Sequence, residues 1–171
     1  GAGRSEDCVS VLQGLTQAGF DVRHAPGVAI DQDDLSGVAT ALGLCTDVDG
    51  ILLCLGEAAV MSGEAASRAY LGLPGRQQDL ADAVFEKAAG KPVVVVLFSG
   101  RPLAVPKLVS RAHAVLAAWF PGCEAGHSIA DVLAGKISPS GRTPVSWPRA
   151  VGQVPIFFGE RPGGRPFNPN D

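Results

Sequence analysis

The sequence lacks any apolar run long enough to cross a membrane, and its first residues lack the charged and then apolar pattern of a secretory signal peptide. It also has no excess of positive charge, because 14 lysines and arginines stand against 17 aspartates and glutamates and the net charge is −3. A nucleic-acid surface needs a basic patch or stripe, and none is visible along the chain. We therefore expect neither a membrane nor a nucleic acid as a partner.

The spacings that bind metal ions, phosphates and dinucleotides are absent as well. The three histidines are scattered, no two cysteines form a C-x-x-C pair, and neither G-x-G-x-x-G nor G-K-[ST] occurs. The sequence therefore predicts no metal site and no cofactor. We interpret the four cysteines as free and mostly buried thiols rather than as a disulfide framework; they are Cys8, Cys45, Cys54 and Cys123.

What the sequence does contain is a regular alternation of helical and extended patterns over 171 residues, a length that suits one domain. Apolar residues make up 46% of the chain and charged residues 18%, which is typical of a globular protein rather than a disordered one. Helices are predicted over residues 5–19, 31–45, 75–90, 102–112 and 127–135, and strands over residues 20–25, 49–56, 91–100, 113–120 and 143–148. This alternation predicts an α/β fold with a mostly parallel sheet that is covered by helices on both faces.

The ends of these elements carry signals of their own. Ser5 is the expected N-cap of the first helix, Pro106 is expected to interrupt the fourth helix, and Pro144 confines the last strand to an edge of the sheet. The strand over residues 49–56 is apolar throughout, so we expect it to be buried on both faces. Because the chain opens on a helix, we also expect that a first strand precedes residue 1.

The loop over residues 56–68 is the first candidate for chemistry. In open parallel sheets, ligand groups gather at the carboxyl ends of the strands, and this loop follows such a strand. It carries two glutamates, Glu57 and Glu64, which are seven residues apart. Glu64 lies among small residues, "MSGEAAS", where the loop can approach another surface closely. Its carboxyl group could act as a proton donor if an apolar neighbour stabilised the protonated form, and a solvated loop carboxylate is the alternative.

Two further loops that follow strands are alternative candidate sites. In "PGCEAGH", Cys123 and His127 suggest a nucleophile with its base, although Pro121 fits a nucleophile elbow poorly. The competing interpretation is a tight turn between a strand and a helix. In "SGRP", Arg101 either binds an anion or makes structural hydrogen bonds to loop carbonyls, and the lack of a glycine-rich phosphate loop favours the second interpretation.

Four motifs occur in a recognisable order along the chain. They are "LGEAAVMSGEAASRAYLGLPGRQQDL", "KPVVVVLFSGRPL", "AWFPGCEAGHSIADVLAGKISPSGRTPVSWPR" and "GQVPIFF" with "GRPF" behind it. Together they closely resemble the C-terminal domain of glycoside hydrolase family 3, in its bacterial β-glucosidase branch. The resemblance runs from about Gly1 to the C-terminus and is strongest from Asp47 onward. It implies a three-layer α/β sandwich whose mostly parallel sheet has five to six strands.

The resemblance also implies a function and a set of site residues. Family members are retaining enzymes that remove a terminal sugar from β-linked glycosides by means of two carboxyl groups. By this resemblance Glu64 is the general acid/base. Glu57 supports the base of the loop through hydrogen bonds to backbone N–H groups, and Arg68 is a partner that helps to set the geometry of the loop. The nucleophile is an aspartate on a preceding barrel domain. The resemblance therefore implies that barrel as a partner, a β-linked oligosaccharide or glycoside as the substrate, and no activity of the isolated chain.

The same motifs suggest a division of the chain and leave other hypotheses open. Residues 1–151 are expected to form the α/β sandwich without its first strand, and residues 152–171 an extended tail that leads toward an absent third domain. The absence of the barrel allows a non-catalytic binding or assembly module, and Cys123 with His127 allows a cysteine hydrolase. An open sheet edge would also allow a homodimer. The compartment stays open between the bacterial cytoplasm and the periplasm.

Overall fold

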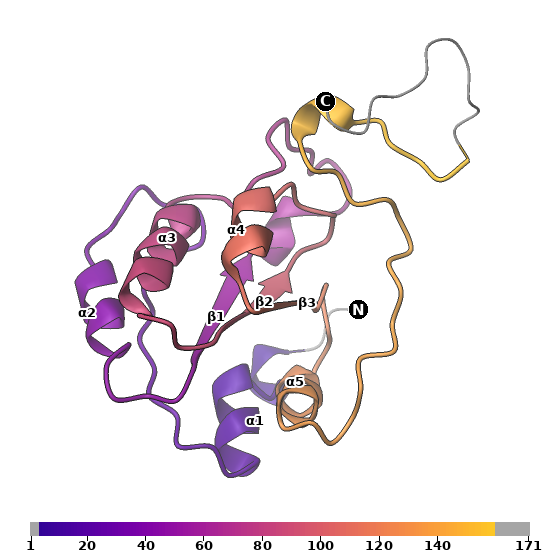
Figure 1. Cartoon of the computed structure of the whole chain (residues 1–171). Helices are drawn as coiled ribbons and strands as arrows, with labels where there is room; N and C mark the ends of the chain where they lie inside the picture. Colours follow the sequence, from indigo (N-terminus) through magenta and orange to yellow (C-terminus); the bar gives the residue numbers. More distant parts are fainter. Residues whose placement is uncertain (1–3, 160–171) are drawn as a thin grey trace.

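A parallel sheet lies at the centre of the computed structural model, which describes residues 4–159 (Figure 1). The sheet contains β1 (Ile51–Gly56), β2 (Val93–Phe98) and β3 (Ala114–Ala117) in the order β1-β2-β3. Ile51 lies opposite Val93, and Val94 lies opposite Ala114. Four consecutive valines begin β2, and β-branched side chains favour the extended backbone. The predicted α/β class with a parallel sheet is confirmed.

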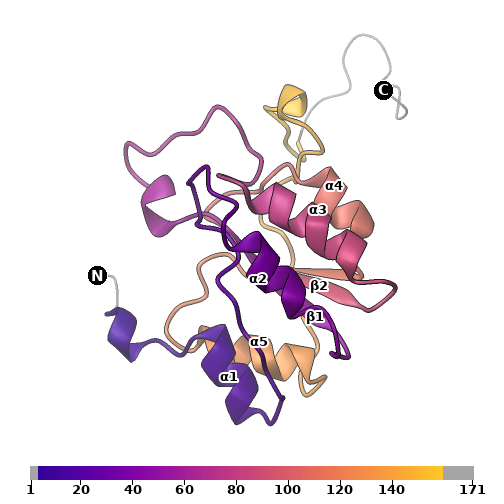
Figure 2. The ribbon, with the colours of Figure 1, turned by 90° about the vertical axis from the view of Figure 1, so that its left-hand side faces the viewer.

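Helices cover both faces of this sheet. In the described part of the chain they are α1 (Val11–Gln17), α2 (Val38–Gly43), α3 (Gln77–Lys87), α4 (Pro106–Arg111) and α5 (Ala125–Leu133), with short 3-10 turns η1 (Ser5–Asp7), η2 (Ala59–Met61) and η3 (Val151–Gln153). In Figures 1 and 2, α2, α3 and α4 lie on one face, and α1 and α5 lie side by side on the other. The predicted layer on each face is therefore present.

The main core lies between the sheet and the layer formed by α2, α3 and α4. β2 supplies Val93, Val95 and Leu97, which alternate along the strand and are each at most 1% exposed. α3 supplies Leu80 and Val84, one helical turn apart. Each such side chain contributes about 1.5–3 kcal/mol when it is fully buried. This core fixes the carboxyl ends of β1 and β2, from which the candidate loops leave.

The layer on the other face depends on a close approach of α1 and α5. A Cβ atom on Gly14 of α1 would lie 2.1 Å from the backbone oxygen of Gly126 in α5, and a Cβ atom on Gly126 would lie 2.1 Å from the backbone oxygen of Ser10. Ser10 is the N-cap of α1 and forms a capping box with Gln13. The two helices therefore meet backbone to backbone at their N-terminal ends.

The sheet is narrower than the resemblance implied, because three strands are present in residues 4–159 rather than five to six. Residues 20–25 do not form the predicted strand, because no neighbouring strand offers them a ladder partner. Residues 143–148 do not form the predicted edge strand either. Two prolines remove backbone donors there, and Trp147 holds the segment through its side chain instead, with Nε1 donating to the Leu103 oxygen at 2.6 Å.

The predicted helices are present but several differ in extent. The first begins at Val11 after Ser10, not after Ser5, which lies in η1. The second covers only Val38–Gly43, because the Asp34 carboxylate accepts the backbone N–H of Ser36 and holds a local turn that competes with a helix. Pro106 begins α4 rather than interrupting it, since the first helical position needs no N–H partner.

Two expectations about single segments have different outcomes. β1 is not buried on both faces, because Cys54 is exposed on the side of the strand that no helix covers fully. The tail over residues 152–171 lies largely outside the described residues, and its described beginning includes only the last two residues of η3. The division of the chain at residue 151 therefore stays a prediction.

Candidate functional site

The candidate loop leaves the sheet at a glycine that no other residue could replace without strain. Gly56, the last residue of β1, has φ +145°, and a Cβ atom there would lie 1.7 Å from the backbone oxygen of Phe98 in β2. The next residue still pairs with β2, because the Glu57 N–H donates to the Phe98 oxygen at 2.8 Å. The loop base is thus fixed at the carboxyl edge of the sheet, and in Figure 2 the loop projects from the body of the molecule.

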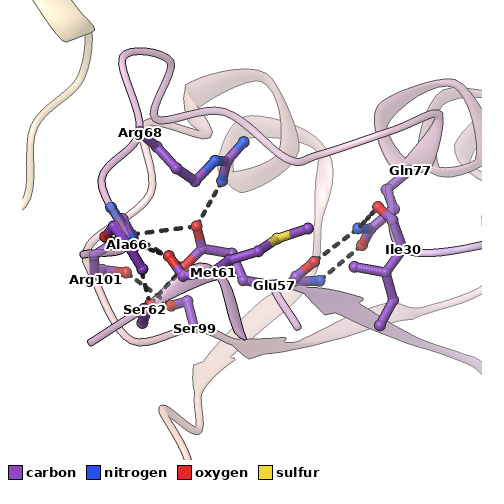
Figure 3. Close-up of polar contacts among 10 residues, drawn as sticks. Ile30, Glu57, Met61, Ser62, Ala66, Arg68, Gln77, Ser99 and Arg101 are labelled. Atoms are coloured by element: carbon purple, nitrogen blue, oxygen red, sulfur yellow. Dashed lines mark hydrogen bonds and ion pairs between the residues drawn. The ribbon is translucent and has the colours of Figure 1, made fainter. Parts of the chain in front are cut away.

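Glu57 lies at the centre of a buried ion-pair cluster at the loop base. Its side chain is fully buried, and Figure 3 shows Arg68 and Arg101 pointing toward its carboxylate. Arg68 Nη1 donates to Glu57 Oε1 at 2.6 Å, and Arg101 Nε lies 3.3 Å from both carboxylate oxygens. The Ser62 hydroxyl lies 3.5 Å from Oε2. Within the described residues the donors are therefore side chains, not the backbone N–H groups that we expected.

Arg101 joins this cluster to the rest of the loop. Its Nη2 donates to the backbone oxygen of Met61 and, at 3.3 Å, to that of Ala66. It also lies 3.2 Å from the Ser62 hydroxyl. These bonds confirm the structural interpretation of Arg101 over anion binding, because the guanidinium group is already engaged by a carboxylate and loop carbonyls.

Gln77 fixes the same strand end from the other side, and the sequence reasoning missed it. Its Oε1 accepts the Gly56 N–H at 2.7 Å, while Nε2 donates to the Gly56 oxygen at 2.7 Å and to the Ile30 oxygen at 2.8 Å (Figure 3). The sequence contained one indication that Gln77 has this role. Gln77 shares the core-facing positions of α3 with Leu80 and Val84, and a buried polar side chain needs partners.

Glu64 lies at the exposed tip of the loop, away from this cluster. It sits between Gly63, with φ +111°, and Ala65, with φ +57°. Among the residues that the structure describes, no hydrogen bond or ion pair reaches its carboxylate. Val60 and Tyr70, elsewhere in the same loop region, are 85% and 81% exposed. The structure thus brings together Glu57 and Arg68 and leaves Glu64 facing solvent.

Cys123 and His127 do not form the nucleophile and base of a cysteine hydrolase in this structure. Both ring nitrogens of His127 are engaged elsewhere, Nδ1 with Glu124 Oε2 and Nε2 with Gln17 Oε1, each at 2.6 Å. The neighbour of the Cys123 thiol is the thiol of Cys8. The turn that carries Cys123 leads directly into α5, in agreement with the competing interpretation of a strand-to-helix turn.

The cysteines are free, but the expectation that most of them are buried is wrong. Only Cys45 is buried, Cys123 is half-buried, and Cys8 and Cys54 are exposed. Cys8 precedes α1 on the surface, and Cys54 faces the open side of β1. Within residues 4–159, no group of three or more histidine, cysteine or acidic residues could hold a metal ion. No helix of this part of the chain is long and apolar enough to span a membrane.

Comparison with known proteins identifies the family of this chain. The model of the glycosyl hydrolase family 3 C-terminal domain matches residues 1–169. A protein described as a periplasmic beta-glucosidase, from Salmonella typhimurium, is 37% identical to this chain over an alignment of 193 positions. The alignment covers 98% of this chain and 25% of that protein. A beta-xylosidase from Formosa agariphila is 36% identical over 157 residues, which cover 90% of this chain and 21% of that protein.

A solved structure agrees with these relatives in fold as well as in sequence. The crystal structure of beta-glucosidase from Listeria innocua in complex with isofagomine has a TM-score of 0.88 and 35% identity, and it covers 98% of this chain and 23% of that one. The chain thus spans about a quarter of the length of the relatives that it matches. It belongs to glycosyl hydrolase family 3 and corresponds to the C-terminal domain of that family.

Proposed function

We propose that this chain is the acid/base-bearing domain of a retaining, exo-acting β-glucosidase-type hydrolase, and that Glu64 is the general acid/base. The observation that carries the proposal is the contrast between the two glutamates of one loop. Glu57 is fully buried and held by two arginines, whereas Glu64 is exposed at the loop tip. The family membership supplies the reaction class, since relatives of this chain are named beta-glucosidase and beta-xylosidase.

The arrangement of the loop suits a carboxyl group that acts on a neighbouring domain. The base of the loop is fixed by Gly56, Gln77 and the Glu57 cluster, so its tip is presented from a rigid support. Gly63 and Ala65 give the tip a tight turn with left-handed backbone on both sides of Glu64. A catalytic carboxyl group needs this kind of positioning, because a misplacement of about 1 Å can cost about 100-fold in rate.

The proposed chemistry divides between two domains. An aspartate of the barrel attacks the anomeric carbon while Glu64 gives its proton to the glycosidic oxygen, so the leaving group departs as an alcohol. In the second step Glu64 takes a proton from water, which attacks the glycosyl-enzyme ester and releases the sugar with retained configuration. The acid form of Glu64 must be populated in the first step, and a barrel surface that covers the loop and removes water would favour that form.

The test is a Glu64→Gln variant of the chain combined with the barrel from the same locus, either joined in one chain or mixed. With an aryl β-glucoside whose leaving group is poor, we expect kcat/KM to fall by about 10²–10⁴-fold, because general-acid assistance is lost. With a very acidic phenol as leaving group the loss in kcat/KM should be small. Added azide should restore turnover, because an anionic nucleophile needs no base.

Two controls make this result specific. Glu86→Gln removes an exposed carboxylate of α3 that the proposal does not use, and it should leave both substrates unaffected. The chain without the barrel should show no turnover, since it holds no proposed nucleophile. Equal losses with good and poor leaving groups and no azide rescue would contradict the role of Glu64. Turnover by the isolated chain that Glu64→Ala abolishes would contradict the two-domain scheme.

The same proposal includes the partners of the chain. A barrel domain would supply the nucleophile and the sugar contacts, and a β-linked oligosaccharide or glycoside would be the substrate. A homodimer through the edge of β1 that pairs with no other strand in residues 4–159 stays a prediction, and light scattering of the chain at high concentration tests it directly. A strict monomer would exclude it.

A further inference from the structure

Two thiols that are far apart in the sequence meet on the surface beside the α1–α5 layer. Cys8 lies in the segment between η1 and α1, and Cys123 lies in the turn before α5. Their Sγ atoms are 3.6 Å apart, although 115 positions separate them in the sequence. In Figures 1 and 2, α1 and α5 lie side by side, so the pair belongs to one continuous surface.

The backbone holds the two thiols together independently of their own contact. The Val9 N–H donates to the Cys123 oxygen at 2.8 Å, and the Gly126 N–H donates to the Val9 oxygen at 3.0 Å. The glycine contact between Gly14 and Gly126 fixes the helices that follow. A disulfide requires two neighbouring backbone segments with converging side chains, and this geometry supplies both without a rearrangement of the fold.

We propose that Cys8 and Cys123 form a disulfide when the chain meets an oxidising thiol–disulfide couple, and that this bond fastens the segment before α1 to the turn before α5. The oxidant is a small disulfide such as oxidised glutathione. The Cys123 thiolate attacks one sulfur of the oxidant and displaces one glutathione thiolate, which takes up the proton lost by Cys123. Cys8 then loses its proton and attacks Cys123 Sγ, which displaces the second glutathione. Two protein thiols are oxidised, and one external disulfide is reduced to two thiols.

The order of these two steps follows from the hydrogen bond within the pair. The Cys8 S–H donates to Cys123 Sγ. This hydrogen bond is the main cause that raises the pKa of Cys8 above its ordinary value. We assign the first attack to Cys123 because its sulfur is the acceptor of the pair, whereas Cys8 is the donor. The other two cysteines have no such partner within the described residues, since Cys45 is buried in the core and Cys54 lies on β1.

The experiment equilibrates the 171-residue chain in oxidised or reduced glutathione, quenches it with acid and maps the peptides without reduction. We expect a mass loss of about 2 Da and one linked peptide pair that contains Cys8 and Cys123. The melting temperature should rise by about 5–15 °C on oxidation, because the bond closes a long loop in the unfolded chain. Cys8→Ser and Cys123→Ser should each lose the link and the rise.

Matched controls separate this pair from oxidation in general. Cys54→Ser removes another exposed thiol and should keep both the link and the rise in melting temperature. Under reducing conditions all three variants should melt within a few degrees of the parent chain, which shows that they fold. Cys8 and Cys123 that stay free or carry separate glutathione adducts in the folded chain would overturn the proposal. So would links that involve Cys54 equally, or a Cys8–Cys123 link with no rise in melting temperature.

Discussion

The replacement Glu57→Gln tests whether the buried ion-pair cluster fixes the candidate loop. Glutamine keeps the shape of the side chain but removes its charge, so Arg68 and Arg101 lose their common counter-ion. The Glu57 side chain is fully buried, and each arginine side chain is only 19% exposed. The two positive charges would then face each other across a neutral amide with little water to screen them.

The expected loss can be worked out from this geometry. Breaking a buried ion pair by removing one partner costs about 3–5 kcal/mol, because the remaining charge is left without compensation. Both arginines keep a fifth of their side-chain surface in water, which lowers the cost, so we expect a fall of about 2–4 kcal/mol in the free energy of unfolding. With a urea m-value of about 2 kcal/mol/M, the midpoint of unfolding should fall by about 1–2 M.

Urea unfolding of the 171-residue chain measures this loss, with circular dichroism and tryptophan fluorescence as independent probes. Glu64→Gln is the matched control, because it makes the same chemical change seven residues away at an exposed position without partners among the described residues. It should change the free energy of unfolding by at most about 0.5 kcal/mol. A Glu57→Gln chain that is destabilised no more than the Glu64→Gln chain, with an unchanged m-value, would refute the anchoring role of Glu57.

Three other predictions use different parts of the molecule. Desolvation raises the pKa of Asp82, but the hydrogen bond and charge of Lys107 outweigh it and hold that pKa below 3.8. Asp82→Asn should therefore lower the free energy of unfolding by about 1 kcal/mol at pH 7, and acid titrations of stability should show this difference being lost as the pH falls through the lowered folded-state pKa. Although the Cys54 side chain is exposed on one face of β1, the atoms packed around it desolvate the thiol and raise its pKa from 9.0 to about 11. Its alkylation at pH 8, followed by mass spectrometry, should therefore be about tenfold slower in the folded chain than in urea. Gly14→Ala should destabilise the chain by about 1–3 kcal/mol through the clash with α5, whereas Gly43→Ala, which meets nothing within 4 Å, should leave or slightly raise the melting temperature in a thermal shift assay.

Long periodic patterns and apolar runs predicted the frame of the fold well. The valine run forms β2, and the amphipathic pattern over residues 75–90 forms α3. Both elements form by burying apolar side chains, and the spacing of apolar residues is visible in the sequence. The segments that failed depend on neighbours. Residues 20–25 have strand-like composition but no ladder partner in the described structure, and residues 143–148 attach through Trp147 rather than through backbone bonds.

The sequence could point to the candidate loop but not to the contacts that hold it. Glu57 and Arg68 were predicted as loop residues from the family resemblance, yet the donors to Glu57 come from side chains, and one of them, Arg101, is 44 positions away. No local pattern encodes such a pairing, because it depends on the parallel register that places the ends of β1 and β2 side by side. Gln77 was missed for the same reason, although its core-facing position in α3 was visible.

The surroundings of the two loop glutamates, rather than their spacing, support the roles that we propose for them. A carboxylate that accepts hydrogen bonds from two guanidinium groups and is closed to solvent has no path to the leaving oxygen of a substrate. A carboxyl group at an exposed tip has no contacts that could hold a loop base. Reversal of the two positions would require both arginines to follow the tip, which the bonds of Arg101 to Met61 and Ala66 prevent. The geometry of the loop therefore supports the proposal that Glu64 carries the acid/base chemistry and that Glu57 keeps the loop in place.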